Sequence, residues 1–200
     1  MIAIIDYGMG NLRSVQKALE KTGSTAQITQ DKETIIKSDK IVLPGVGAMK
    51  PAMDKLKSLN LIETIKEVIS KNKPFLGICL GFQLLFESSQ EGGDSVDGLK
   101  IIQGQVKRFT KGKIPHMGWN ELIIKKKNCP LFKDISQQSF VYFCHSYYAK
   151  PKDLSMATTT TQYSLEFVSS LWQENIFGVQ FHPEKSQEIG LTILKNFGKL

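Results

Sequence analysis

The first half of the chain alternates short, almost entirely apolar segments with stretches of helical spacing. The apolar segments are residues 2–5, 41–43 and 75–78. Segments of this length without polar interruption are typical of strands buried on both faces of a parallel sheet. Residues 12–19 and 61–69 repeat their apolar positions every three to four residues, which predicts amphipathic helices. The alternation predicts an α/β fold with a doubly wound, mostly parallel sheet flanked by helices.

The second half changes character and predicts an antiparallel β segment appended to this core. Residues 103–180 contain short β-rich stretches separated by turn signals, and a final helix follows them. We find no repeat, no low-complexity tract and no long linker, so we expect residues 1–200 to form a single domain, with residues 91–94 as a plain loop. The expected strands of this half are residues 140–143, 154–161, 167–172 and 176–181.

The composition is that of an ordinary globular protein, with 41% hydrophobic and 22% charged residues. No apolar run approaches the ~18–20 residues that a membrane-spanning helix needs, so we expect no membrane contact. The first residues lack a basic leader, which argues against a secretory signal. The three cysteines, Cys79, Cys129 and Cys144, form no paired spacing, so we expect a reducing, cytoplasmic location.

The formal net charge of +7 raises the question of a nucleic-acid partner. Of the 26 basic residues only Arg13 and Arg108 are arginines, whereas base readout favours arginine geometry. The basic run at residues 125–127 is typical of a solvated loop. We therefore expect no nucleic-acid partner, and we interpret the charge as an aid to solubility or as steering of an anionic partner.

Cys79 has the sequence surroundings of an activated nucleophile. It lies between Gly77 and Gly81, after an apolar strand and before a helical run at residues 80–86. This strand–turn–helix pattern is typical of a nucleophile elbow, in which glycines allow a strained turn and close helix packing. The start of the helix favours a thiolate, and the amide of Leu80 could donate to an oxyanion. The alternative is a buried structural cysteine; Cys144 looks like such a core residue, and Cys129 like a loop residue.

His182 and Glu184 form the second candidate site, at the end of a predicted strand. They are two residues apart and so project to the same side if the chain stays extended, which Pro183 favours. A carboxylate beside an imidazole fixes its tautomer and stabilises the imidazolium, so that the imidazole can deprotonate a thiol. The alternative is a polar turn before the last helix. His116 and His145 are rival bases, but neither has an acid two residues away.

The third candidate is the glycine-rich end of a strand at residues 43–47. Exposed amides there could bind an anion or a developing oxyanion, although a plain turn between strand and helix would look the same. A second glycine motif, residues 6–11, lacks the third glycine of a dinucleotide fingerprint, because Arg13 occupies that position. In that motif Asn11 is a suitable helix N-cap. We predict no metal site and no organic cofactor.

Taken together, these motifs resemble the class I (triad) glutamine amidotransferases over the whole chain. The shared motifs are PGVG (residues 44–47), GICLGFQ (77–83) and GVQFHPE (178–184). Within that family the chain is similar to the glutaminase subunits of imidazole glycerol phosphate synthase, from histidine biosynthesis. The narrower likeness rests on DYGMGNLRSV (6–15), PHMGWN (115–120), HSYY (145–148) and EKS (184–186). Phe82 and Cys144 depart from the aliphatic residues that are usual at these positions.

The resemblance implies a flavodoxin-like glutaminase fold and a cysteine thioester mechanism. Cys79 would attack the side-chain amide of glutamine, His182 would carry the proton, and Glu184 would orient His182. Ammonia would leave, and hydrolysis of the thioester would release glutamate. The oxyanion hole would be formed by Val46, Gly47 and Leu80, and the glutamine pocket would include Gly45, Gln83, His145, Ser146 and Tyr147.

The resemblance also implies a partner. The subunit would form a heterodimer with a (β/α)8-barrel cyclase, which uses the ammonia on the bisphosphorylated nucleotide PRFAR. Glutaminase activity would stay low until partner and nucleotide bind, with the peptide at Val46–Gly47 as the switching element. The docking face would include Asn11, Trp119, Tyr142 and Lys185.

Three other interpretations remain open at this stage. The chain could be a glutaminase of another pathway, with the sugar-amidating paralogues closest in pattern. It could be a cysteine hydrolase or isopeptidase that acts alone, because a Cys-His-Glu set does not by itself name a substrate. It could also be a non-catalytic binding module that keeps the elbow as scaffold.

Overall fold

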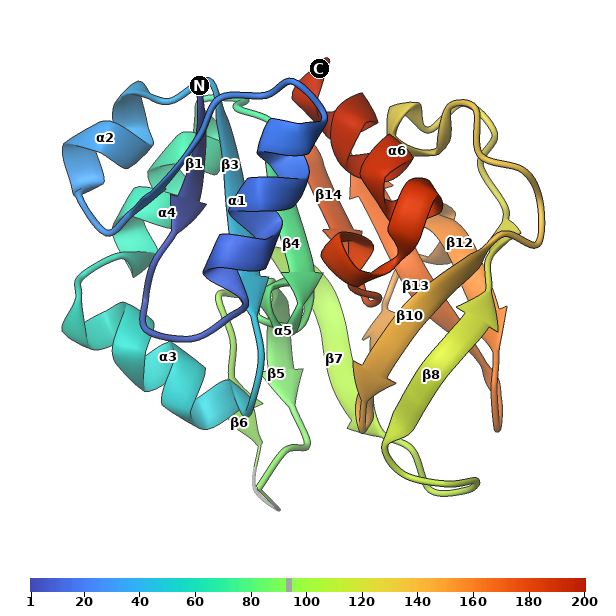
Figure 1. The fold of residues 1–200 in the computed structure, drawn as a ribbon. Helices are drawn as coiled ribbons and strands as arrows, with labels where there is room; N and C mark the ends of the chain where they lie inside the picture. Colours follow the sequence, from blue (N-terminus) through green and yellow to red (C-terminus); the bar gives the residue numbers. More distant parts are fainter. Residues whose placement is uncertain (93–94) are drawn as a thin grey trace.

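The computed structural model describes residues 1–92 and 95–200 and is built around a central twisted sheet (Figure 1). Taken in their order across the sheet, the first five strands pair in parallel and the last three continue antiparallel, which confirms the predicted sheet with an antiparallel extension. The strand expected at residues 176–181 in the antiparallel part is the junction instead: it pairs in parallel with residues 75–79 and antiparallel with residues 166–173. Within the described residues, the strand order is β2 (Ala26–Thr29), β1 (Ile2–Ile5), β3 (Lys40–Gly45), β4 (Phe75–Cys79), β14 (Ile176–Val179), β13 (Glu166–Gln173), β12 (Ala157–Gln162) and β9 (Ile123–Ile124).

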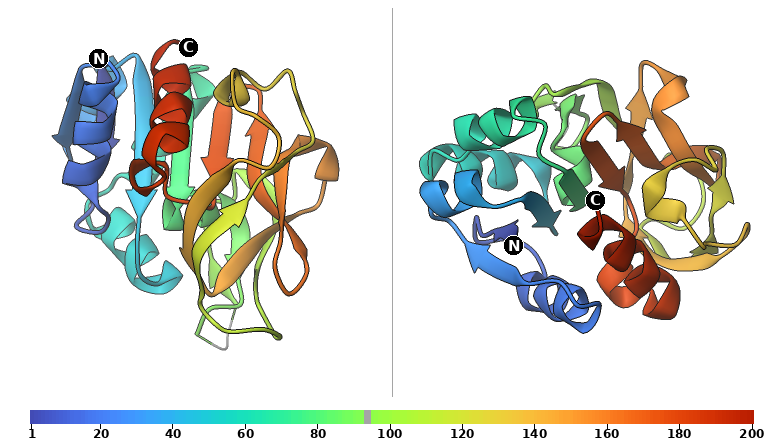
Figure 2. Two further views of the ribbon diagram at one scale, coloured as in Figure 1. Left: turned by 45° about the vertical axis from the view of Figure 1, so that its right-hand side comes forward. Right: turned by 90° about the horizontal axis from the view of Figure 1, so that it is seen from above.

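Helices cover both faces of the parallel strands, as a doubly wound sheet requires (Figure 2). One face packs against the apolar sides of α1 (Leu12–Lys21) and α6 (Gln187–Gly198). The other packs against α2 (Lys32–Lys37), α3 (Met49–Ser58) and α4 (Ile62–Ser70). The inner parallel strands β1, β3 and β4 are buried on both faces, which explains why their sequences are almost continuously apolar instead of alternating.

Two smaller sheets complete the second half of the chain. One pairs β10 (Phe140–His145) with β8 (His116–Glu121). The other has the order β11 (Tyr147–Pro151), β7 (Ile102–Arg108), β5 (Phe86–Ser89) and β6 (Val96–Asp97). Single 3-10 turns lie at Pro130–Phe132, Leu154–Met156 and Pro183–Lys185.

Two predicted elements differ from the structure by three residues at one end, and the others by fewer. The helix expected at residues 80–86 is the short α5 (Leu80–Gln83), because the carbonyls of Leu84 and Leu85 accept hydrogen bonds from residues 99 and 102 instead of continuing the helix. The chain then enters β5. The strand expected at residues 154–161 begins only at Ala157, because Asp153 accepts a hydrogen bond from the amide of Ser155 and caps a 3-10 turn.

Three single-residue predictions also need correction. Asn11 stands at the N-cap position of α1, but its side chain makes no capping hydrogen bond to the described residues. Cys129 does lie in a turn, yet it is buried, and burial raises the pKa of its thiol to about 11. Cys144 is half-buried and is therefore not a core residue. In the predicted loop at 91–94, Gly93 and Asp94 lie outside the described residues.

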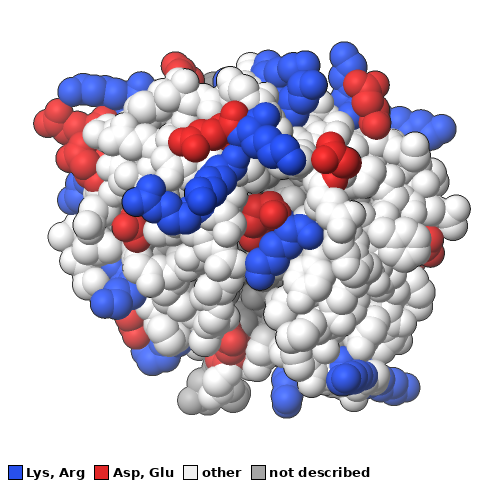
Figure 3. Space-filling view, viewed as in Figure 1, with Lys and Arg blue, Asp and Glu red and all other residues white. Residues whose placement is uncertain are grey.

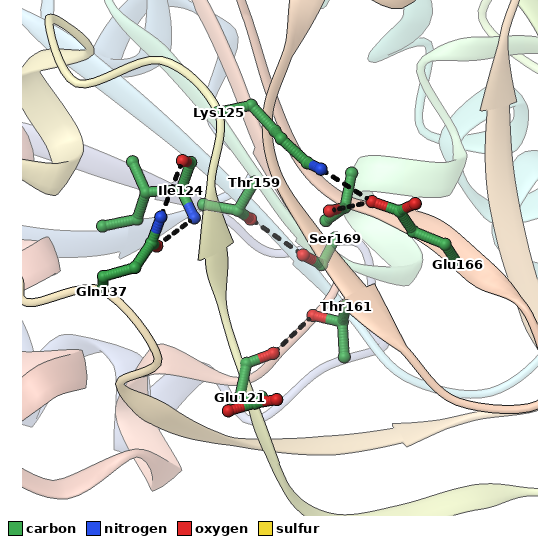
Figure 4. Close-up of polar contacts among 9 residues, drawn as sticks. Glu121, Ile124, Lys125, Gln137, Thr159, Thr161, Glu166 and Ser169 are labelled. Carbon is green, nitrogen blue, oxygen red and sulfur yellow. Dashed lines mark hydrogen bonds and ion pairs between the residues drawn. The ribbon is translucent and has the colours of Figure 1, made fainter.

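Side-chain hydrogen bonds close the outer edge of the central sheet at β9 (Figure 4). The amide of Gln137 accepts from the backbone N–H of Ile124 and donates to the carbonyl of the same residue. On the neighbouring strands, the hydroxyls of Thr159 and Ser169 lie 2.8 Å apart and are buried. Gln137 therefore completes the backbone pairing at this edge, and the hydroxyl contact links the next two strands.

The surface charge is dispersed on the face seen in Figure 3, where lysine and arginine side chains are interspersed with acidic ones. In the basic run, Lys125 pairs with Glu166 at 2.9 Å. No helix in the described part of the chain combines the length and the apolar character needed to cross a membrane.

We predict that Gly81→Ala lowers the free energy of unfolding by more than about 2 kcal/mol, because a Cβ on Gly81 would collide with the backbone carbonyl of Leu43. Urea denaturation measures the change. Gly198→Ala is the matched control, since its Cβ would meet only the movable side chain of Ser24. We expect that control to be neutral, or more stable by up to about 1 kcal/mol. Equal loss in both variants would contradict the close contact.

Candidate active site

Three neighbouring parallel strands bring the sequence-predicted motifs to one edge of the sheet. In the β3–β4 pair, Gly45 is opposite Cys79, so the glycine-rich segment begins beside the cysteine. β14 is the other neighbour of β4 and leads directly to His182. Because the carboxyl ends of parallel strands lie at one edge, residues far apart in sequence meet there.

The backbone at Cys79 has the strained geometry of a nucleophile elbow. Its φ is 53° and its ψ is −109°, a left-handed φ that non-glycine residues seldom adopt. The turn is possible because the flanking glycines allow close packing: a Cβ on Gly77 would lie 2.8 Å from the carbonyl oxygen of Gly81. Cys79 is consequently held at the start of α5, with the amide of Leu80 next to it.

His182 is buried between Cys79 and a carboxylate. Its Nδ1 lies 2.9 Å from Oε1 of Glu184, and both side chains are almost fully buried. With Nδ1 donating to that carboxylate, Nε2 is left to face Cys79. Burial alone would lower the pKa of His182, but the hydrogen bonds and charges of Cys79 and Glu184 outweigh it and raise this pKa to about 10. The site thus favours an imidazolium beside the sulfur.

A cavity of about 320 Å³ opens at this point. It holds both Cys79 and His182, while Glu184 lies behind His182 and outside the lining. Gly45 also lies outside it, because its open side is covered by Tyr7 and Leu80. The other predicted residues in the lining are Val46, Gly47, Leu80, Gln83, His145, Ser146, Tyr147 and Lys185.

The two rival bases form a hydrogen-bonded pair beside the cavity. His116 Nδ1 lies 2.9 Å from His145 Nε2, and His145 Nδ1 lies 2.7 Å from the carbonyl oxygen of Tyr147. Burial lowers the pKa of His116 to about 4 and that of His145 to about 3. Both nitrogens of His145 are therefore used within the protein, and neither histidine is placed to activate Cys79.

Comparison with known proteins agrees with this geometry. The family model "Glutamine amidotransferase class-I" matches residues 3–199. The chain is 50% identical to imidazole glycerol phosphate synthase subunit HisH of Geobacter sulfurreducens, over 100% of this chain and 98% of that protein. It is 52% identical to the HisH subunit of Caldanaerobacter subterraneus, again over 100% of this chain and 98% of the other. The chain belongs to the class I glutamine amidotransferases, in the HisH family.

A solved glutamine amidotransferase structure supports the fold of this amidotransferase. It superposes with a TM-score of 0.77 at 13% identity and covers 100% of both chains. No group of three or more potential metal-ligating side chains occurs among the described residues.

Two residues of this amidotransferase were not singled out from the sequence. Glu91, assigned to a plain loop, lines the cavity and accepts a hydrogen bond from the amide of Met49, and burial raises the pKa of its carboxyl group. Gln180 is fully buried and lies 3.8 Å from the sulfur of Cys79. Its place two residues before His182 on an extended chain was a signal that could have found it, because alternate residues share a side. No local pattern marked Glu91.

The residues expected on the docking face are partly contiguous. Trp119 is exposed and its ring centroid lies 6.1 Å from that of Tyr142. Lys185 places its ammonium group 5.8 Å from the centroid of the Tyr142 ring, and Lys185 also lines the cavity. Met117 and Phe140 are exposed on the same two strands, β8 and β10. This surface therefore adjoins the cavity that holds Cys79 and His182.

We predict that none of the three histidines titrates like a free histidine, because the pKa values of His116 and His145 are lowered and that of His182 is raised. In NMR of ¹³C-labelled histidine, His116 and His145 stay neutral, and His182 stays charged, over the range of about pH 5 to 8 in which a free histidine titrates. Below about pH 6.5 His116 and His145 bind protons in the unfolded chain but stay neutral in the folded one, because burial lowers their pKa values. The free energy of unfolding therefore falls as the pH drops below 6.5. Three ordinary titrations would contradict the buried pair and the ion pair.

Proposed function

We propose that this chain is the glutaminase subunit of an imidazole glycerol phosphate synthase, with residues 1–200 acting as a single amidotransferase domain. Cys79, His182 and Glu184 serve as its catalytic triad. The observation that carries the proposal is the placement of His182, buried between the carboxylate of Glu184 and the sulfur of Cys79 in one cavity. The identity of about 50% to HisH subunits over the full chain supports the choice of synthase.

The first half of the reaction forms a thioester. The Cys79 thiolate attacks the carbon of the glutamine side-chain amide, and the carbonyl oxygen takes up the negative charge. The His182 imidazolium then gives its proton to the departing nitrogen, and ammonia leaves. Glu184 holds the ring by its Nδ1–H and stabilises the imidazolium, so the proton stays on the side of the ring that faces the substrate.

The second half releases glutamate. With ammonia gone, neutral His182 takes a proton from a water molecule, which attacks the γ-glutamyl thioester. Collapse of the tetrahedral intermediate expels the sulfur of Cys79 as thiolate, and the cycle closes. The same histidine thus acts first as acid and then as base.

Backbone amides would stabilise the oxyanion in both steps. The amide of Leu80 follows the nucleophile at the start of α5, and Val46 and Gly47 lie across the cavity. One missing donor costs about 10²–10³ in rate, so the orientation of the Val46–Gly47 peptide would set whether the subunit is active. Such a peptide is a natural point of control, because it can turn without moving the triad.

Glutamine would lie in the cavity with its two ends recognised separately. Gln83, Ser146 and Tyr147 line the wall near Cys79, while Glu91 supplies a carboxylate suited to the α-ammonium group. His145 contributes indirectly, because its Nδ1–H holds the carbonyl of Tyr147. Gly45 acts by allowing β3 to pack against the elbow.

The cyclase subunit, a (β/α)8 barrel, would dock on the exposed surface of β8 and β10 around Trp119, Tyr142 and Lys185, with Asn11 at its margin. Lys185 belongs both to this surface and to the cavity lining, so ammonia released at Cys79 would leave toward the partner. The cyclase would use it to convert PRFAR into imidazole glycerol phosphate and AICAR.

We expect Cys79→Ala to abolish glutamine hydrolysis, by at least about 10⁴-fold, while leaving docking to the cyclase intact. Glu184→Gln should lower the rate of hydrolysis by a factor about 10 to 100 times smaller than Cys79→Ala does, because it disturbs the orientation of His182 but keeps the nucleophile. Glutamate release in the assembled synthase measures both. Glu188→Gln, an exposed carboxylate in the first turn of α6, is the control and should match the wild type. Turnover by Cys79→Ala would remove the nucleophile assignment, and full activity of Glu184→Gln would remove Glu184 from the triad.

We expect glutamate release by the isolated chain to be slow and to rise by about 10²–10³ with the cyclase and PRFAR, as completion of an oxyanion hole predicts. Ammonium salts should support cyclisation without glutamine. Equal activity with and without partner would indicate a stand-alone hydrolase or the glutaminase of another pathway. Failure of ammonium to support cyclisation would exclude a role in ammonia supply.

A further inference from the structure

A pair of buried amides connects the substrate-side wall of the cavity to the sulfur of Cys79. Gln180 is fully buried, and its backbone N–H donates to the carbonyl of Ser169, which fixes its position beyond β14. Its side-chain Oε1 accepts from Nε2 of Gln83 at 2.9 Å. Its Nε2 lies 3.8 Å from Sγ of Cys79, at hydrogen-bonding distance for sulfur.

The orientation of both amides is dictated by one carbonyl group. Nε2 of Gln83 lies 2.9 Å from the carbonyl oxygen of Tyr147, which can only accept. Gln83 must therefore present its NH₂ group there, and its second hydrogen points to Gln180. Gln180 must in turn present its oxygen to Gln83, which leaves its NH₂ group facing Cys79. Rotating either amide by half a turn would set like groups against each other.

The carbonyl of Tyr147 also accepts a hydrogen bond from a second side chain. His145 Nδ1 donates to it, so neutral His145 accepts at Nε2 from His116. His116 then accepts at its own Nε2 from the side-chain amide of Asn120, 3.2 Å away. Since the oxygen of Asn120 already accepts from the amide of Glu121, its orientation is fixed as well. Each donor in this series of hydrogen bonds, from Asn120 to Gln180, therefore has one possible direction.

We propose that Gln180 is a positioning residue of the glutaminase, whose amide N–H donates to the thiolate of Cys79. A thiolate accepts such a bond much better than a thiol, so the bond favours the thiolate–imidazolium pair with His182 over the neutral pair. The bond also limits rotation of the Cys79 side chain and so aims the sulfur into the cavity. This inference rests on the proposed role of Cys79 as nucleophile.

The test measures the reactivity of Cys79 in the isolated chain, with no need for partner or substrate. Peptide-resolved mass spectrometry follows alkylation by iodoacetamide at neutral pH, in Gln180→Glu and Gln180→Met. Glutamate places an oxygen against the sulfur, and methionine has similar length without a donor. We expect Cys79 alkylation to slow by about tenfold or more in both, as for loss of a hydrogen bond to a charged group. In the assembled synthase, kcat should fall while KM for glutamine stays within about twofold.

Two controls separate positioning from general damage. Cys129 is buried and lies outside the lining of this cavity, so its slow alkylation in the same sample should not change. Thr158→Val removes another buried hydrogen bond, the 2.6 Å contact between Thr158 and Ser170, at a site outside the cavity lining, and should leave Cys79 reactivity unchanged.

Each outcome decides one of the two claims. Cys79 alkylation within about threefold of wild type in either folded Gln180 variant overturns the inference, and so does equal slowing in Thr158→Val. Gln180→Met is uncharged, so it keeps the test decisive if Gln180→Glu fails to fold. A rise in KM with unchanged kcat would also overturn it, since that indicates a role in shaping the pocket. Retained activity of Cys79→Ala, by contrast, would refute the proposed function itself.

Discussion

The proposed active site depends on one short contact, the packing of the first turn of α5 against the end of β3. Gly81 approaches the carbonyl of Leu43 so closely that no side chain fits between them. That contact lets the chain reverse at Cys79 with a left-handed φ and places the sulfur beyond the sheet edge, with the amide of Leu80 beside it. The strain at Cys79 is supported by the buried strands on either side, β3 and β14.

The order of the strands in the sheet then determines which segments lie next to Cys79. Because β4 lies between β3 and β14, the segments that leave those two strands flank the cysteine. β3 contributes backbone amides at Val46 and Gly47, and β14 contributes His182. The antiparallel strands of the second half bring a further wall, through Tyr147 and its neighbours. One half of the chain thus positions the proposed nucleophile, and the other half contributes the proposed base and part of the pocket.

The sequence predicted what is encoded locally. Continuous apolar runs predicted three of the parallel strands, β1, β3 and β4, and the spacing of Gly77, Cys79 and Gly81 predicted the elbow. What it missed depends on contacts between distant segments. The helix after Cys79 ends early because the carbonyls of Leu84 and Leu85 are used by the segment that returns through residues 99–102. Glu91 enters the cavity for the same kind of reason, since its hydrogen-bond partner is Met49, far away in sequence.

The pairing of the buried His116 and His145 could not be predicted from the sequence either. Adjacent acids are visible in a sequence, so His182 was preferred to its rivals. The partners of His116 and His145 are each other, and burial makes both neutral. Their role in holding a backbone carbonyl follows from the tautomers that the hydrogen bonds impose, which no spacing rule describes.

The amide of Gln137 has a consequence for how this molecule meets others. By bonding both backbone groups of Ile124, it takes the place that a further strand would occupy beside β9. A strand from another copy would have to displace it, so the sheet terminates here and does not template intermolecular pairing. Contacts at this end of the sheet are therefore left to side-chain surfaces, such as the exposed aromatic face of β8 and β10. One glutamine side chain thus protects this edge from strand addition.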